Sequence, residues 1–198
     1  MPDHVTARDS ATQFTPHPEG QFGMVCVDCI DLGERVKRFK AEKPYLAFCV
    51  SLVFQSGEEN DDGKLHEINR EFTVSMGKKA NLRAFLESWR GKSYTEEQAR
   101  EGVPLHKLVG QAALVSVEHK ANADGSRVYA NIRSISPLPK GMVAPTLPAY
   151  ERPPYFATRA AKYAEEVEAY RASMGVHGGG ADADYPAPFD ESGDDLPF

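Results

Sequence analysis

Hydrophobic and polar residues alternate along the first half of the chain in a way that predicts three β-strands. Residues 22–32 form a β-prone run, and residues 44–55 follow it with a period of two. After the turn-like residues 60–63, residues 64–76 continue the pattern. The side chains predicted to face the core are Leu46, Phe48, Val50, Leu52, Phe54, Ile68, Phe72 and Val74. Arg70 falls on the same face of the third strand, which a β-bulge or an open barrel mouth would explain.

The period then changes to that of a helix. Leu82, Phe85, Leu86 and Trp89 stand at positions i, i+3, i+4 and i+7, and Gly91 is suited to end the helix. This spacing makes Trp89 a core residue. Two further strands are predicted over residues 111–119 and 127–138, and their turn contains Asp124 and Gly125. In the last strand one face carries Val128, Ala130 and Ile132.

Three strands, a helix and two strands follow one another in the order of the five-stranded OB barrel, which has its helix between strands 3 and 4. We therefore predict a mainly β fold with an OB barrel over residues 21–139. Other half-open barrels of five strands are the alternative.

The segments around this barrel predict appendages. Residues 1–20 are polar and aperiodic, which predicts a flexible N-terminal arm. Residues 140–180 hold a proline-rich linker and a C-terminal helix over 155–174, and residues 181–198 are expected to be a disordered acidic tail. The apolar stripe of the helix is irregular, so it leaves open whether the helix packs on the barrel, stays apart or joins a homo-oligomer.

Charge is segregated along the chain. The formal net charge is -6, and residues 181–198 carry six acidic residues and no Lys or Arg, so the remainder is neutral. Three cysteines form an odd and sparse set, and no stretch resembles a signal peptide or a membrane span. We expect a protein of a reducing cytoplasm that does not bind membranes.

An OB barrel binds its ligand across strands 2 and 3, between the loops that join strands 1 to 2 and 4 to 5. Both loops are rich in cations. The first, residues 33–43, has five Lys or Arg against two Glu, and the second, residues 119–127, has two against one Asp. Such charge suits phosphate groups.

Aromatic residues accompany these cations, and bases stack on aromatic rings without demanding a particular sequence. Tyr45 and Tyr129 alternate with core residues and are expected to point outward, and Phe39 lies in the basic loop. Solvated loops and ordinary surface tyrosines are the plainer interpretation. The residues predicted to bind DNA are Arg35, Lys37, Arg38, Phe39, Lys40, Lys43, Tyr45, Lys120, Arg127, Tyr129 and Arg133.

The chain ends in Asp194, Asp195, Leu196, Pro197 and Phe198. This ending resembles the acidic tip of the bacterial single-stranded DNA-binding protein family, which has Ile at the position of the Leu. The resemblance implies that these five residues bind partner proteins, with the terminal Phe ring in an apolar pocket and its carboxylate against a basic side chain. Residues 81–91 look instead like a group of phage and prophage proteins, so we expect a phage-encoded version acting in the host cytoplasm.

Other motifs lack the residues that their chemistry needs. Cys26 and Cys29 have no second pair to complete a zinc site, and the Gly91-Lys92-Ser93 sequence lacks the first glycine of a phosphate loop. The six histidines are scattered. We therefore predict no metal site, no cofactor and no catalytic residue.

These features together predict a sequence-tolerant single-stranded DNA-binding protein of DNA replication, recombination or repair, which recruits replication or recombination proteins through its tip. A recombination mediator or replisome adaptor that mainly binds protein is the first alternative. An enzyme of nucleic-acid processing is the second.

Overall fold

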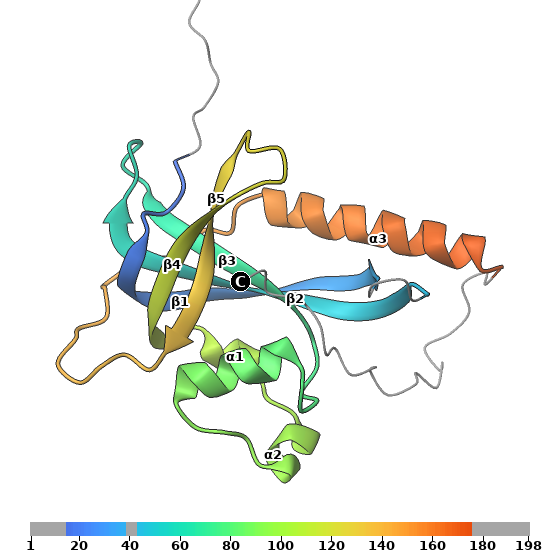
Figure 1. The fold of residues 1–198 in the computed structure, drawn as a ribbon, viewed down its shortest axis with the longest axis horizontal. Coiled ribbons are helices and arrows are strands. Elements are labelled where there is room, and N and C mark those ends of the chain that lie inside the picture. Colours follow the sequence, from blue (N-terminus) through green and yellow to red (C-terminus); the bar gives the residue numbers. More distant parts are fainter. Residues whose placement is uncertain (1–14, 39–42, 176–198) are drawn as a thin grey trace, which may run out of the picture.

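The computed structural model describes residues 15–38 and 43–175. Five antiparallel strands form one sheet in the order β3-β2-β1-β4-β5 (Figure 1). The strands are β1 (Gly20–Lys37), β2 (Tyr45–Glu59), β3 (Leu65–Thr73), β4 (Ala112–Ala121) and β5 (Val128–Ser136). Helices α1 (Asn81–Arg90) and α2 (Glu96–Glu101) and the 3-10 turn η1 (Leu105–Leu108) separate β3 from β4, and α3 (Tyr155–Ser173) follows β5. The mainly β class, the helix between the third and fourth strands and the C-terminal helix are thus confirmed.

The sheet curls so that its two edge strands, β3 and β5, lie near each other, but in the described part of the chain no strand ladder joins them. Arg70 crosses this gap. Its guanidinium donates to the Ile132 carbonyl at 3.2 Å and lies over the rings of Phe72 and Phe85. The open gap between β3 and β5 therefore explains why a polar residue lies on the inner face of β3. In the described residues the sheet does not close into a barrel.

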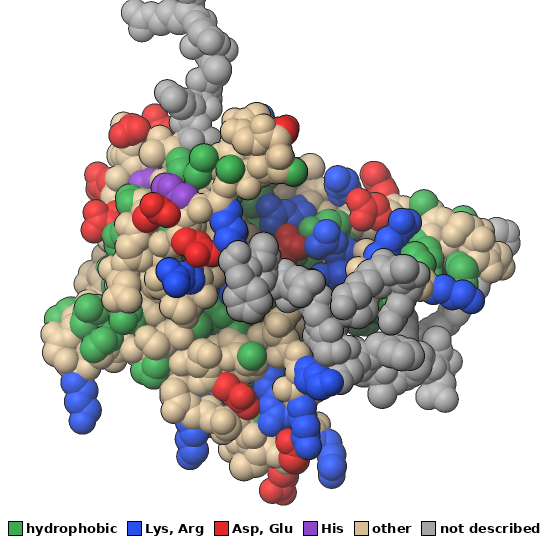
Figure 2. Space-filling model, in the orientation of Figure 1, with side chains coloured by type: hydrophobic (Ala, Val, Ile, Leu, Met, Phe, Trp, Pro, Cys, Tyr) green, Lys and Arg blue, Asp and Glu red, His purple; other side chains and the backbone are tan. Residues whose placement is uncertain are grey.

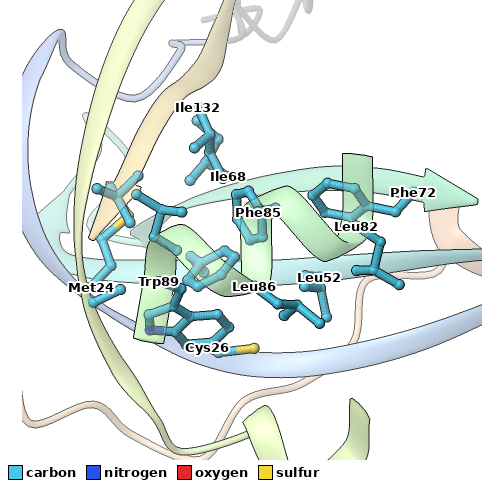
Figure 3. Close-up of a cluster of buried hydrophobic side chains, with 14 of the residues drawn as sticks. Met24, Cys26, Leu52, Ile68, Phe72, Leu82, Phe85, Leu86, Trp89 and Ile132 are labelled. Carbon is cyan, nitrogen blue, oxygen red and sulfur yellow. The ribbon is translucent and has the colours of Figure 1, made fainter. Parts of the chain in front are cut away.

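Helix α1 packs into the concave side of the sheet and buries its predicted stripe (Figure 3). Trp89 is only 6% exposed, and its indole N–H donates to the Ala112 carbonyl at 2.9 Å. Gly91 ends the helix at a φ of 65°, a left-handed conformation that favours glycine. We call the buried residues on this side the α1 cluster: Met24, Cys26, Val50, Leu52, Phe54, Ile68, Phe72, Leu82, Phe85, Leu86, Trp89, Ala113, Val115, Val117, Ile132 and Ile135.

Three residues predicted to be in the core are exposed. Phe48, Val74 and Val128 keep the expected alternation, but they lie where α1 no longer covers the sheet. Val74 also follows the last residue of β3. The prediction was wrong at these positions because periodicity gives the face of a residue and not how far along the strand that face stays covered.

Helix α3 packs on the opposite face of the sheet. Phe156 and Tyr163 are buried against strands β1 and β2, and these two residues with Ile30, Leu32, Cys49 and Val53 form what we call the α3 cluster. Residues 49–54 of β2 are consequently buried on both faces. Of the arrangements that the sequence left open for this helix, packing on the sheet is the one observed.

The proline-rich segment before α3 also lies against the sheet. The Arg152 side chain makes two hydrogen bonds to the Asp28 carboxylate, at 2.7 and 3.0 Å, and the Tyr150 hydroxyl donates to Glu67 at 3.2 Å. Residues 137–154 therefore act as a strap that leads the chain from β5 to α3 (Figure 1).

The fold begins earlier than predicted. His17 lies in the segment expected to be a flexible arm, yet it is only 2% exposed. Its ring nitrogens lie 2.9 Å from the Pro18 carbonyl oxygen and 2.8 Å from the Ser56 hydroxyl. Burial of a hydrogen-bonded imidazole holds this residue in place. Within the described ranges, no helix has the length and apolar character needed to cross a membrane.

Candidate nucleic-acid interface

The end of the β1–β2 hairpin carries four of the predicted DNA-binding residues in the described part of the chain. Lys37 pairs with Tyr45 across the two strands, and both are half-buried. Arg38 and Lys43 are exposed just beyond that pair. The structure thus brings three cations and one aromatic ring together. Phe39 and Lys40 lie outside the described residues, as do Asp194, Asp195, Leu196, Pro197 and Phe198.

Arg35 has a different role from the one expected. Its guanidinium donates to the Glu71 carboxylate at 3.2 Å and lies 4.6 Å from the centre of the Tyr163 ring. Its partner in the ladder is Ala47, which stands two residues from Cys49 of the α3 cluster. Side chains two residues apart in a strand share a face, so Arg35 points to the α3 side of the sheet. We assign Arg35 to the contact with α3 and not to a phosphate site.

The second group of predicted DNA-binding residues lies at the β4–β5 hairpin, on its outer side. Tyr129 is 43% exposed and pairs with Lys120. Glu118 is the neighbouring acid, and its carboxylate oxygens lie 3.1 Å from Lys120 and 4.0 Å from Arg133. Ion pairs with this exposure contribute little to stability, so the two cations can exchange Glu118 for a phosphate at small cost.

The turn between β4 and β5 holds Arg127 in a hydrogen-bonded loop. The backbone N–H of Arg127 donates to the Asn122 side chain at 2.9 Å, and the Ser126 N–H donates to Asp124 at 2.8 Å. Hydrogen bonds from Ser126 hold the pKa of the Asp124 carboxyl below its usual value. This turn therefore presents one positive and one negative group, which reduces its net attraction for phosphate.

Helix α3 packs over β1, and its side chains reach β2 and β3 on the face where we expected the ligand. Glu71 of β3 accepts hydrogen bonds from Arg159, at 2.6 Å, and from the Tyr163 hydroxyl, at 3.0 Å. Glu67 accepts one from Tyr155 at 2.6 Å. In the view of Figure 1, α3 runs between the β4–β5 turn and the end of the β1–β2 hairpin. Part of the face expected to hold the ligand is thus covered by a helix, because the sequence did not reveal where α3 packs.

Phe48 and Val74 are surface residues that the sequence analysis assigned to the core. They are 53% and 48% exposed, on the side of the β1–β2 hairpin away from α3. A pocket beside them is lined by Val74, Ser75, Met76, Gly77, Lys78, Arg83, Glu96, Ala99 and Arg100. No signal in the sequence distinguishes Phe48 from its buried neighbours in β2.

The three cysteine thiols are placed as structural residues and not as metal ligands. Cys26 and Cys49 are buried and Cys29 is half-buried. Burial, helped by the charge of neighbouring Cys29, raises the pKa of the Cys26 thiol to about 12. Within residues 15–38 and 43–175, no group of three or more His, Cys, Asp or Glu side chains is arranged to hold a metal ion.

No match to the chain is found among protein-family models, curated proteins or solved structures.

Proposed function

We propose that this protein binds single-stranded DNA without sequence preference, through an OB-type barrel that stays open between β3 and β5. The curled five-stranded sheet with α1 beneath it, between the third and fourth strands, supports this proposal most strongly. In this arrangement, the two hairpin ends that carry the exposed cations are the loops an OB barrel uses for its ligand.

Phosphate groups contact the cations at these two hairpin ends, and the exposed ring of Tyr129 stacks on a base. The proposed phosphate contacts are Lys37, Arg38, Lys43, Lys120, Arg127 and Arg133. Because α3 occupies the outer face of β2 and β3, the bound strand runs around this helix and not beneath it.

The acidic tip gives the protein its second activity. By its resemblance to the tip of the bacterial single-stranded DNA-binding proteins, the segment Asp194–Phe198 recruits replication or recombination proteins during phage or prophage DNA metabolism. Before a partner arrives, the six acidic residues of the tail compete with DNA for the cations.

Titration of the full chain with fluorescent oligo-dT tests DNA binding directly. We expect binding whose affinity falls with salt, and the double variant Arg38→Ala/Lys43→Ala should lower the slope of log K against log salt by about 0.7 per lost phosphate contact. Lys140→Ala is the matched control, because Lys140 is an exposed cation of the strap before α3, outside the proposed interface. No binding to oligo-dT at about 50 mM salt would reject the proposal.

Deletion of residues 190–198 tests the role of the tail. The shortened chain should bind oligo-dT more tightly, with the largest gain at low salt, since screening weakens the competition of the tail. A gain that does not depend on salt, or no gain, would contradict electrostatic competition.

The covered face of β2 and β3 favours one second candidate, an adaptor that mainly binds protein. An OB-type domain whose usual ligand face is filled by its own helix has less surface for a DNA strand. Weak binding of oligo-dT by the full chain, together with tight binding of a replication protein through residues 194–198, would support the adaptor.

A further inference from the structure

The ring of Phe48 lies on the concave side of the β1–β2 hairpin, yet no helix of the described residues covers it. The backbone N–H of Val74 donates to the Phe48 carbonyl at 2.8 Å, directly after the ladder pair Cys49 and Thr73. Residues opposite each other in antiparallel strands share a face, so the two side chains are neighbours. We call them the Phe48–Val74 patch.

This patch continues the surface on which the α1 cluster is built. Val50 and Phe72, one step further along the same two strands, are both buried under α1. Phe48 and Val74 lie beyond the reach of that helix and remain about half exposed. The backbone that carries this ring is held in a hydrogen-bonded ladder beside a packed core.

Cations lie next to the patch. Val74 lines one pocket with Lys78 and Arg100, and Figure 2 shows Lys and Arg side chains gathered near α2. Glu96 is the acid of this pocket, and it lies 3.3 Å from Arg83 and 3.9 Å from Lys78. Arg100 is exposed and forms no ion pair with any residue that the structure describes.

The acid opposite Phe48 in the neighbouring strand is neutralised. Glu34 pairs with Phe48 in the ladder, but its carboxylate is directed toward α3, where it accepts a hydrogen bond from Arg171 and shares a pocket with Val167. In the pocket beside Val74, the cations Lys78, Arg83 and Arg100 stand against one carboxylate, that of Glu96. Cations beside an exposed aromatic ring are a combination that binds single-stranded nucleic acid.

We propose that Phe48 is a base-stacking platform for single-stranded DNA, with Lys78 and Arg100 contacting the adjacent phosphates. This inference rests on the proposed function and adds to it a binding surface on the side of the β1–β2 hairpin away from α3. Lys37 is three residues beyond Glu34 in β1, about 10 Å along the strand, so the patch also adjoins the cationic end of the hairpin.

The size of the patch favours a base over a second protein chain. Stable protein interfaces bury about 1,200 to 2,000 Å² in total, with several anchoring side chains on each partner. Phe48 and Val74 are the two large, exposed hydrophobic residues at this place in the described chain. One aromatic ring is enough for one base.

A tryptophan at position 48 provides the most direct test. The native Trp89 is buried, so its emission should respond little to ligand. In Phe48→Trp the introduced indole should be quenched as oligo-dT binds, with an affinity close to that of the unchanged chain. Phe48→Ala should bind about 5-fold to 150-fold more weakly, and Phe48→Leu should be weakened similarly because it keeps apolar area but has no ring to stack.

Matched controls separate the patch from general effects. Val143 is 87% exposed and lies in the strap before α3, so Val143→Ala should leave affinity unchanged. Lys78→Ala and Arg100→Ala should each lower the salt slope by about 0.7, while Lys140→Ala should not.

The outcomes distinguish this inference from the proposed function. If the unchanged chain binds oligo-dT but Phe48→Ala binds equally well and Phe48→Trp shows no quenching, the stacking platform is rejected and DNA binding stands. If the unchanged chain binds no oligo-dT, both fail. If sedimentation shows a dimer that Phe48→Ala and Phe48→Leu convert to a monomer without loss of DNA affinity, the patch belongs to a second copy and the inference is overturned.

Discussion

The two faces of the sheet are stabilised in different ways. The α1 cluster contains 16 buried residues, and its side chains are almost entirely apolar. The α3 cluster contains six, and polar contacts surround it, above all those of Glu71 with Arg35, Arg159 and Tyr163. Because the hydrophobic effect scales with buried apolar area, the first face should provide most of the stability of the domain. The second face should depend on a few directional contacts.

This difference bears on function. A helix held by a small apolar cluster and a polar rim can separate from the sheet at a lower free energy than the whole domain unfolds. The face of β2 and β3 beneath α3 is where an OB-type protein would bind its ligand. Changes that act on one cluster at a time therefore test whether the two faces are independent.

The largest effect should come from Phe54→Ala in the α1 cluster. Phe54 has no exposed surface, and its ring packs edge-on against Trp89 at 5.2 Å between centroids. The substitution should lower the free energy of unfolding by about 3 to 5 kcal/mol, because it removes a buried ring and leaves a cavity. Urea denaturation followed by Trp89 fluorescence measures this, and one transition for the whole domain is expected.

Phe156→Ala should have a smaller and more local effect. Phe156 is also buried, but it belongs to the α3 cluster and lies near the start of α3. We expect a loss of about 2 to 3 kcal/mol, below the usual range for this substitution, because release of the helix limits the cost. In hydrogen exchange, the amides of α3 should lose protection while those of β4 keep theirs. Equal loss of protection throughout would show that the two faces form one cooperative unit.

The α1 cluster is also the part of the fold that the sequence predicted best. Residues 82–89 carry a complete helical stripe, and Ile68 and Phe72 alternate as a strand with one buried face should. In each case the period identifies the buried face. Gly91 marked the end of the helix because its backbone conformation favours glycine.

The position of α3 could not be read from the chain in the same way. Its stripe is irregular because several of its contacts are polar, such as the bond of Tyr155 to Glu67 and that of Tyr170 to the Pro44 carbonyl. Such bonds join residues far apart in sequence and leave no period. For the same reason the sequence predicted the cations and Tyr129 of the candidate site, but not the position of α3 on the sheet. It also did not predict the exposure of Phe48, because the period gives the face of a residue and not how far α1 covers that face.

Tyr163→Phe should have a third, smaller effect, on α3 alone. It removes a hydroxyl that donates to Glu71 but keeps the buried ring, so we expect a loss of about 1 kcal/mol. Burial and the Glu71 charge raise the pKa of Tyr163 to about 12, from an ordinary value of 10. The folded state therefore keeps its proton where the unfolded chain loses it, and stability falls as pH rises from 10 to 12. This fall in stability at alkaline pH should be weaker in Tyr163→Phe. Thermal unfolding followed by circular dichroism measures both the stability lost by the substitution and its dependence on pH.

The smallest effect on stability should come from the titration of His17, at the edge of the α1 cluster, and it should appear just below neutral pH. Burial is the largest cause that lowers the pKa of this imidazole, and the positive charges of His66 and His119 act in the same direction, against the Pro18 carbonyl and Glu58. The unfolded chain then binds the proton more readily than the folded one, so stability should fall as pH drops below the ordinary histidine value of 6.5.

His17→Gln removes this titration and keeps a side chain that can bond to Ser56. Thermal unfolding of both proteins at several pH values between about 7.5 and 5.5 isolates the contribution of His17, because other titrating groups act equally on the two. The difference in midpoint should change with pH only if His17 is held neutral in the fold. An identical pH dependence in the two proteins would mean that the acid sensitivity of the sheet has another origin, and only the alkaline loss at Tyr163 would then separate the two faces by pH.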